Sequence, residues 1–173
     1  GHVDAAHLLL NAGAAVDKQR EGEWSPFGLA CALGNVDVAT LLVERGADSA
    51  SVNRCVSGMP PLLFACRKRD FDAMRLCVGH GANVQLAGTA GTTSLHVACE
   101  NGLVDQALWL LECGAVVDQA DKYGETPLRI ACQQGHVAVV RMLLDKGEEV
   151  DRANKWGNTP LLMACLSGHV DAA

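Results

Sequence analysis

Thr126-Pro127-Leu128-Arg129-Ile130-Ala131 is one of five related six-residue stretches in this chain. The other four are, in order, Ser25-Pro26-Phe27-Gly28-Leu29-Ala30, Pro60-Pro61-Leu62-Leu63-Phe64-Ala65, Thr93-Ser94-Leu95-His96-Val97-Ala98 and Thr159-Pro160-Leu161-Leu162-Met163-Ala164. Successive stretches begin 35, 33, 33 and 33 residues apart. A period of this size is typical of a protein built from stacked repeats, in which each repeat packs only on its neighbours.

Each stretch has the residue types that begin a helix. A Ser or Thr side chain can accept a hydrogen bond from a free backbone N–H of the first turn, and a proline at the next position loses nothing because that N–H has no partner in a helix. A glycine nine residues after the start predicts the end of this short helix. Apolar residues at helical spacing then predict a second helix in each repeat, as over residues 104–111 and 137–144.

A second series of marks has the same period. Gly-Ala or Gly-Glu pairs follow the second helices, at Gly13, Gly46, Gly81, Gly114 and Gly147. With both series in register, the chain resembles the ankyrin repeat family, whose 33-residue repeat carries a Thr-Pro-Leu-His-x-Ala signature, and the resemblance covers essentially all 173 residues. It implies an all-α solenoid of helix-turn-helix repeats with projecting β-hairpin-like turns.

The repeat marks predict one array over residues 1–173. The expected boundaries are a leading partial repeat at 1–20, repeats at 21–55, 56–88, 89–121 and 122–154, and a trailing partial repeat at 155–173. Both ends fall inside a repeat, and Gly1–Ala6 and Gly168–Ala173 have the same sequence. We therefore expect a piece of a longer array, with apolar surface exposed at both ends.

One repeat departs from the pattern between residues 54 and 72. It follows a two-residue insertion. Pro60 stands where the other repeats have a capping Ser or Thr, and Arg69 stands where they have glycine. If the turn keeps a left-handed residue there, a side chain costs roughly 1 kcal/mol. Residues 54–72 are therefore either a degenerate repeat or a site with a role of its own. We expect the local stability of the array to be lowest there.

The eight cysteines suggest free thiols. Five of them, Cys31, Cys66, Cys99, Cys132 and Cys165, occupy one repeat position, and stacked helices set equivalent residues roughly 8–10 Å apart. That distance is too long for a disulfide or a shared zinc ion. We expect these five and Cys77 to be buried and Cys55 and Cys113 to be more exposed. Free thiols favour a reducing compartment, either the cytoplasm or the nucleus.

Composition and charge narrow the classes of partner. The formal net charge of −6 argues against general binding to nucleic acid, and no apolar run approaches the ~20 residues that span a bilayer. His96 and the histidines of the Gly-His-Val turns, His2, His136 and His169, recur with the repeat, so we interpret them as structural. We expect no enzyme activity, no catalytic residue, no metal site and no cofactor.

The resemblance places a partner in a concave groove formed by the turn tips and the ends of the first helices. Carried over to this sequence, it implies the contact residues Trp24, Met59, Arg67, Lys68, Glu100, Asn101, Lys122, Tyr123, Glu125, Gln133, Gln134, Lys155, Trp156 and Asn158. Trp24, Tyr123 and Trp156 are favoured as anchors, since binding hot spots are rich in Trp and Tyr. The alternative is that these aromatic rings only pack on the neighbouring turn. We expect Tyr123 and Trp156 to lie about 10 Å apart, at the spacing of stacked helices.

The sequence thus favours a non-catalytic, monomeric module that binds protein partners. Two alternatives remain open: a structural spacer, or a regulatory or docking arm of a larger protein such as a kinase, a ubiquitin ligase adaptor or a channel.

Overall fold

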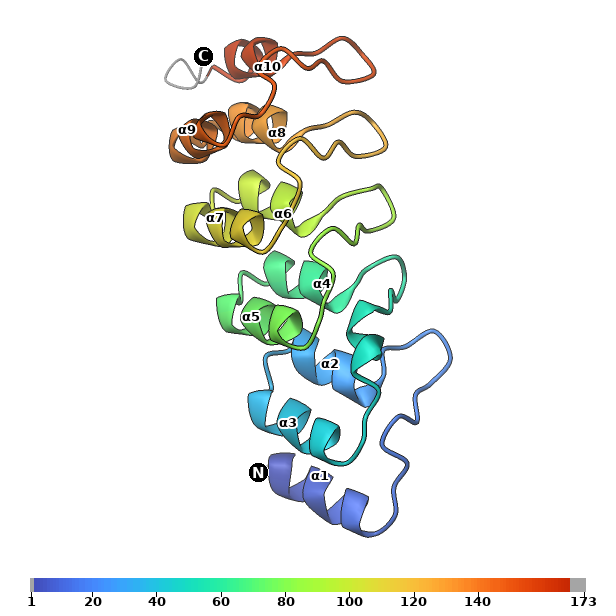
Figure 1. Cartoon of the computed structure of the whole chain (residues 1–173). Coiled ribbons are helices and arrows are strands. Elements are labelled where there is room, and N and C mark those ends of the chain that lie inside the picture. Colours follow the sequence, from blue (N-terminus) through green and yellow to red (C-terminus); the bar gives the residue numbers. More distant parts are fainter. Residues whose placement is uncertain (1, 169–173) are drawn as a thin grey trace. The chain divides into compact units, whose positions relative to one another are not determined.

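The computed structural model describes residues 2–168, and His169, which was predicted to belong to a turn, lies outside them. The chain forms two compact units, Gly1–Leu86 (the N-terminal half) and Ala87–Ala173 (the C-terminal half). The described part of each half consists of short helices and turns, so the predicted all-α repeat class is confirmed (Figure 1).

The N-terminal half contains five α-helices and one 3₁₀ helix among its described residues. They are α1 (His2–Asn11), α2 (Pro26–Ala32), α3 (Val36–Glu44), η1 (Ser49–Asn53), α4 (Pro61–Arg67) and α5 (Phe71–Gly79). Helix α2 packs on α3, α4, α5 and η1, and α1 packs on α3. The core between them is apolar and includes the fully buried side chains of Phe27, Leu63 and Met74.

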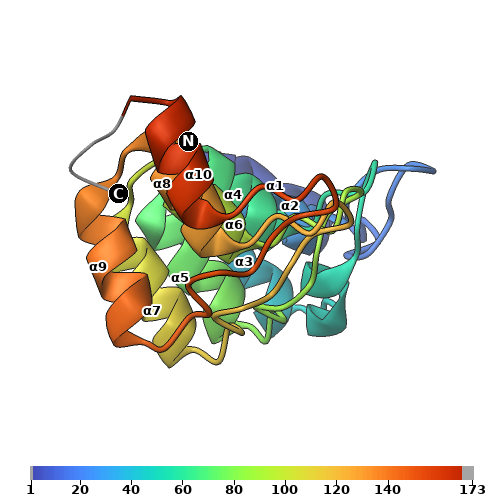
Figure 2. The same ribbon diagram turned by 90° about the horizontal axis from the view of Figure 1, so that it is seen from above.

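The C-terminal half repeats the same pair of helices. Its described elements are α6 (Ser94–Glu100), α7 (Val104–Glu112), α8 (Pro127–Gln134), α9 (Val137–Asp145) and α10 (Pro160–Leu166). First helices α6, α8 and α10 stack in one layer, second helices α7 and α9 in another, and the turns project away from the second layer (Figure 2). Leu95, Leu110, Leu128 and Leu143 are buried between these helices.

The predicted caps are present. Ser25, Thr93, Thr126 and Thr159 each accept a hydrogen bond from the backbone N–H three residues later, and Pro26, Pro127 and Pro160 occupy the first helical position. In the irregular repeat Pro60 is the N-cap of α4 and makes no such bond. Asp70 instead caps the second helix of that repeat by accepting from the N–H of Ala73.

The segment between Gly46 and Pro60, which carries the two extra residues, contains η1, which the sequence did not predict. Val52 is buried against α2, and the hydroxyls of Ser25 and Ser51 are 2.7 Å apart. This segment therefore packs on the first helix of the repeat that precedes the irregular one.

A left-handed residue closes the turn between the two helices of each repeat, as expected. Arg69 has φ 57°, close to the 70° of Gly102 at the equivalent position. Gly102 has a second constraint, because a Cβ added there would lie 2.9 Å from Nδ1 of His136. His136 in turn lies 3.0 Å from the carbonyl oxygen of Glu100 through Nε2, which joins two neighbouring repeats.

The cysteines follow the prediction with one correction. All eight are free; Cys31, Cys66, Cys77, Cys99 and Cys132 are buried, Cys55 is exposed and Cys113 is half-buried. Cys165 was expected to be buried and is exposed. It lies on α10, and the described residues place no further repeat against that helix.

Candidate functional site

Two turns of the C-terminal half, residues 121–125 and 154–158, form hairpins that we call the paired hairpins. The N–H of Asp121 donates to the carbonyl of Glu125, and that of Asn154 to the carbonyl of Asn158, both at 3.0 Å. The side chain at the first position shapes each loop from inside. Asp121 Oδ1 accepts from the N–H groups of Tyr123 and Glu125 at 2.8 and 2.9 Å, and Asn154 Oδ1 accepts from Trp156 and Asn158 at 3.0 Å.

The paired hairpins lie edge to edge. The N–H of Lys155 donates to the carbonyl of Tyr123 at 3.0 Å, and the N–H of Lys122 makes the same bond to Ala90 in the preceding turn. Gly124 permits this approach, since a Cβ there would lie 3.1 Å from Cα of Asn154. Equivalent residues of the two hairpins are therefore held in register by backbone bonds.

The aromatic rings of Tyr123 and Trp156, which we call the aromatic pair, stack on each other. Their centroids are 5.7 Å apart and their planes make an angle of 25°. The expected separation of about 10 Å is wrong for the rings, because the backbone bond between the hairpins brings the two side chains together. Tyr123 is 41% exposed and Trp156 is 65% exposed, so much of this apolar surface faces solvent.

Two lysines flank the aromatic pair. Lys122 and Lys155 are both exposed, and Lys122 Nζ lies 4.8 Å from the ring centroid of Tyr123. A cation over an aromatic face is attracted by the ring quadrupole, which holds this ammonium beside the stack. The predicted tip residues Lys122, Tyr123, Lys155 and Trp156 thus form one continuous surface.

Glu125, a predicted contact residue, is paired within the protein. Its carboxylate forms an ion pair with buried Arg129 and accepts a hydrogen bond from Nδ2 of Asn154 at 2.9 Å. Arg129 also donates to Oε1 of Gln133 at 3.1 Å. Gln133, another predicted contact residue, therefore belongs to the same network. Sequence alone missed the network because Arg129 occupies a signature position that we interpreted only as part of the repeat.

His96 links the first helix of one repeat to the hairpin of the next. Its Nδ1 accepts from the N–H of Thr93 at 3.1 Å, and its Nε2 donates to the carbonyl of Glu125 at 3.0 Å. Burial lowers the pKa of His96 to about 4. The ring is therefore neutral near pH 7 and bonds to the hairpin of residues 121–125.

Trp24, a predicted contact residue, packs on the next turn. Its Nε1–H donates to the carbonyl of Met59 at 3.2 Å, and its ring meets that of Phe64 edge-on at a centroid distance of 5.2 Å. Both Trp24 and Met59 are half-buried. The alternative considered for the aromatic tips, packing on the neighbouring turn, therefore describes Trp24.

The predicted helix-end residues divide between the two halves. Arg67 and Lys68 are exposed on the N-terminal half; Glu100 and Gln134 are exposed on the C-terminal half, where Asn101 and Asn158 are half-buried. Asn101 donates from Nδ2 to the carbonyl of Val97 at 2.8 Å and so stabilises the end of its own helix.

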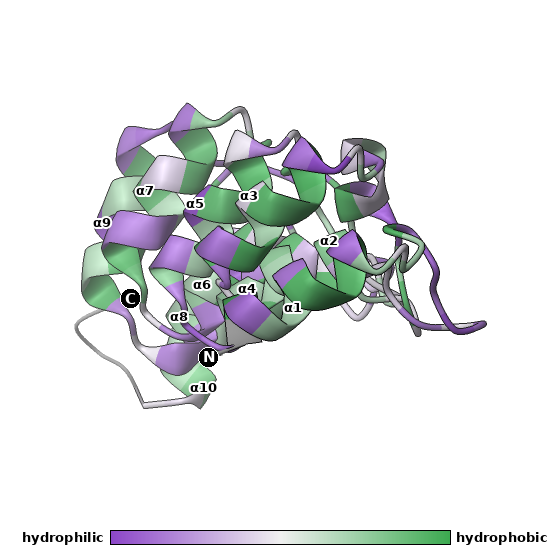
Figure 3. Ribbon diagram, turned by 90° about the horizontal axis from the view of Figure 1, so that it is seen from below, coloured by the Kyte–Doolittle hydropathy of each residue, from purple (hydrophilic) through white to green (hydrophobic). Residues whose placement is uncertain are grey.

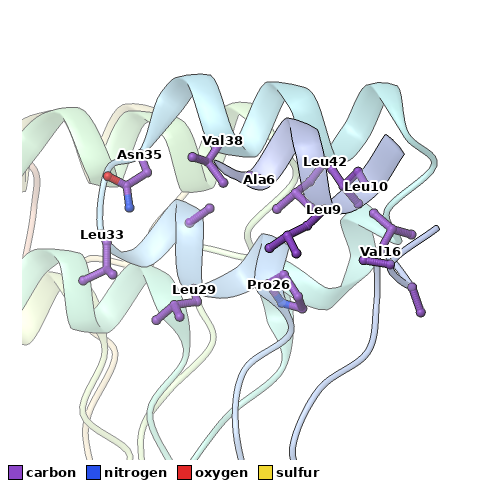
Figure 4. A pocket seen from close by; sticks show the side chains of 13 residues that line it. Ala6, Leu9, Leu10, Val16, Pro26, Leu29, Leu33, Asn35, Val38 and Leu42 are labelled. Carbon is purple, nitrogen blue, oxygen red and sulfur yellow. The ribbon is translucent and has the colours of Figure 1, made fainter. Parts of the chain in front are cut away.

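An apolar groove of about 330 Å³ lies among α1, α2 and α3 in the N-terminal half (Figure 4). Leu9 and Leu10 of α1, Leu29 and Leu33 of α2 and Leu42 of α3 are among the side chains that line it. Helices α2 and α3 are hydrophobic over much of their length (Figure 3). The sequence predicted exposed apolar surface at the chain ends but not this groove among α1, α2 and α3.

Glu148 has a buried carboxyl group, and the sequence did not predict its burial. It is 4% exposed, and Oε1 accepts from the N–H of Leu128 at the start of α8 at 2.9 Å. Burial is the main cause that raises the pKa of Glu148 to about 7, with a smaller contribution from Asp118. The other repeats have alanine at this position, at Ala14, Ala47, Ala82 and Ala115.

Among residues 2–168, no group of three or more His, Cys, Asp or Glu side chains could hold a metal ion. No helix in the same part of the chain is long and apolar enough to cross a membrane.

Comparison with known proteins gives the family. A model described as "Ankyrin repeats (3 copies)" matches residues 49–121 and 95–173, and one described as "Ankyrin repeat" matches residues 23–55. The chain belongs to the ankyrin repeat family. Ankyrin repeats are protein-interaction modules and are generally non-catalytic, which agrees with the coarse function predicted from the sequence.

Similar ankyrin repeat proteins include ubiquitin ligases. The chain is 35% identical over 107 residues to the probable E3 ubiquitin-protein ligase XBOS33 of Oryza sativa subsp. japonica, which is 60% of this chain and 20% of that protein. It is 31% identical over 112 residues to ankyrin repeat and SOCS box protein 11 of Homo sapiens, which is 65% of this chain and 34% of that protein. It therefore spans about a fifth to a third of the length of these relatives.

Proposed function

We propose that this ankyrin repeat array binds a protein partner through the tips of the paired hairpins, with the aromatic pair at the centre of the contact. The observation that carries the proposal is the exposure of two large stacked rings, 41% for Tyr123 and 65% for Trp156. Tyr and Trp are enriched among residues whose truncation weakens binding most, and their apolar bodies and polar tips suit a surface that is wet when unbound.

The hairpins give this contact a rigid support. Asp121 and Asn154 fix the loops from within, and the bond from Lys155 N–H to the carbonyl of Tyr123 fixes one loop on the other. A preorganised surface loses less conformational entropy when it binds, so more of the contact energy appears as affinity.

The test is a double variant, Tyr123→Ala with Trp156→Ala. The rings bury little against the core, so the fold should be retained while partner binding weakens by at least ~2 kcal/mol. Binding is measured by titration calorimetry with a partner first captured from a cell lysate, and the fold by circular dichroism. Val116→Ala with Val150→Ala, which removes two exposed apolar side chains outside the hairpins, is the matched control. An aromatic variant that folds and binds normally would show that the partner uses another face.

A second candidate function is a substrate-docking arm of a larger ubiquitin ligase. It is favoured by the name of the rice relative XBOS33 and by the small share of the relatives' length that the chain matches. On this proposal the 173-residue chain forms no ubiquitin conjugates with activating and conjugating enzymes alone. The same chain fused to an unrelated ligase domain directs ubiquitin to the bound partner, and the Tyr123→Ala, Trp156→Ala form of the fusion does not.

A further inference from the structure

The paired hairpins present hydrogen-bond donors rather than acceptors, and this property indicates the chemistry of the partner. The exposed polar groups around the aromatic pair are the ammonium groups of Lys122 and Lys155, the indole N–H of Trp156 and the hydroxyl of Tyr123. Three of these four groups can only donate hydrogen bonds.

Side-chain oxygens of Asp121, Asn154 and Glu125 make bonds within and between the same two loops. Asp121 Oδ1 accepts two backbone N–H groups of its own loop, and Asn154 Oδ1 does the same in the neighbouring loop. The carboxylate of Glu125 is paired with Arg129 and with Nδ2 of Asn154. The acidic groups of the loops are therefore turned inward, and the two lysine charges face solvent.

From this arrangement we infer that the paired hairpins bind an acidic segment of a partner protein, in which carboxylate side chains flank an apolar residue. The apolar residue lies against the aromatic pair, and the carboxylates bond Lys122 and Lys155. This inference rests on the proposed function, because it names the class of partner for the same surface.

The two lysines give this surface a local positive charge on a chain of negative net charge. The formal net charge is −6, and Lys122 and Lys155 attract an acidic segment against that sign. A nucleic acid fits less well, because its affinity depends on many phosphate contacts and this surface offers two cations. An acidic peptide needs only a few charge contacts beside one apolar anchor.

The experiment uses two synthetic peptides of about twelve residues. One has glutamates on both sides of a central leucine and phenylalanine, and the other has glutamine in place of every glutamate. We expect fluorescence anisotropy to show binding of the acidic peptide, weakening as salt is added because exposed charges are screened. The glutamine peptide should bind at least about tenfold more weakly. In ¹H–¹⁵N spectra the indole signal of Trp156, assigned with Trp156→Phe, should shift on addition of the acidic peptide.

Charge reversal at the tips is the decisive variant. Lys122→Glu with Lys155→Glu should weaken binding of the acidic peptide at least about tenfold. Lys18→Glu with Lys146→Glu, two exposed lysines outside the hairpins, changes the net charge equally and should have little effect. The inference is overturned if the control weakens binding as much, if the two peptides bind alike, if an oligonucleotide of similar length binds more tightly, or if the acidic peptide does not bind at about 1 mM.

The two proposals fail in different ways. If the aromatic double variant still binds the captured partner, the proposed function is wrong. If the aromatic variant loses that partner while the charge-reversed variant keeps it, the tips are the binding surface and the acidic partner is wrong.

Discussion

Arg69 shows the cost of one departure from the repeat at the scale of a single residue. Its φ of 57° lies in the left-handed region, where equivalent positions have glycine. A side chain there crowds the backbone by roughly 1 kcal/mol. Arg69→Gly should therefore raise the free energy of unfolding by up to about 1 kcal/mol in urea melts.

The complementary change is Gly102→Ala, which should lower the free energy of unfolding by more than about 1 kcal/mol. The alanine has the cost of the left-handed backbone, and its Cβ also contacts the ring of His136. Gly81→Ala, with φ 87° and no atom within 4 Å of an added Cβ, supplies the left-handed cost alone as the reference. Equal stability of Arg69→Gly and the parent chain would mean that interactions of the Arg69 side chain offset the strain of its backbone.

Glu148 gives the stability of the chain a pH dependence. An unfolded glutamate titrates near 4.5, whereas the pKa of buried Glu148 is about 7. Below pH 4.5 both states are neutral and the carboxyl has no effect. Between pH 4.5 and 7 the unfolded state loses its proton first, so this group lowers stability as the pH rises, by on the order of 3 kcal/mol in total.

Glu148→Gln tests this directly, since an amide oxygen can still accept from the N–H of Leu128 and does not titrate in this range. Stability should be similar for both proteins at pH 4.5, and the variant should be more stable at pH 8. The measurement is the urea midpoint across pH 4–8, with the difference between the two proteins cancelling other titrating groups. A constant difference over that range would mean that Glu148 ionises normally in the folded state.

At the scale of the helix, capping and packing make unequal contributions. Thr126 accepts from the N–H of Arg129 at the start of α8, and Leu143 of α9 is fully buried. Thr126→Ala should cost on the order of 1 kcal/mol through the lost cap, and Leu143→Ala ~2–5 kcal/mol through the cavity that it leaves. Urea melts that rank the two variants in the opposite order would place the core elsewhere.

The features that the sequence predicted correctly depend on residues close in the chain, and the features that it missed depend on contacts with the neighbouring repeat. The caps at Ser25, Thr93 and Thr126 follow from one residue and the next three, so they could be predicted. The pairing of Glu125 with Arg129 and Asn154 involves side-chain geometry in two repeats, which periodicity does not specify.

The candidate site shows the same division. Periodicity placed Tyr123 and Trp156 at equivalent tips, but the 5.7 Å stack depends on a backbone bond between hairpins. Trp24 lies one residue before its helix cap Ser25, where the C-terminal hairpins have Glu125 and Asn158, and it packs on the next turn, which offers the carbonyl of Met59 and the ring of Phe64.

At the scale of the whole molecule, the stability of a repeat array is set by contacts between neighbours, so it varies along the chain. The repeat at residues 54–72 lacks the Ser or Thr cap of its first helix and carries Arg69 in a strained conformation. Amide hydrogen exchange should therefore show opening around Arg69 before opening around Gly135. Better protection at Arg69 would indicate that η1 and the Trp24 contacts outweigh those two defects.

The reactivity of the buried thiols reports on the unfolding of this chain. Burial raises the pKa of Cys31, Cys66 and Cys77 to about 12 and that of Cys132 to about 11, so near neutral pH they hold almost no thiolate, the form that alkylating reagents attack. Each becomes reactive only when its helix opens. Mass spectrometry after a brief alkylation pulse thus reads, cysteine by cysteine, the order in which the helices open, with exposed Cys55 as the internal standard.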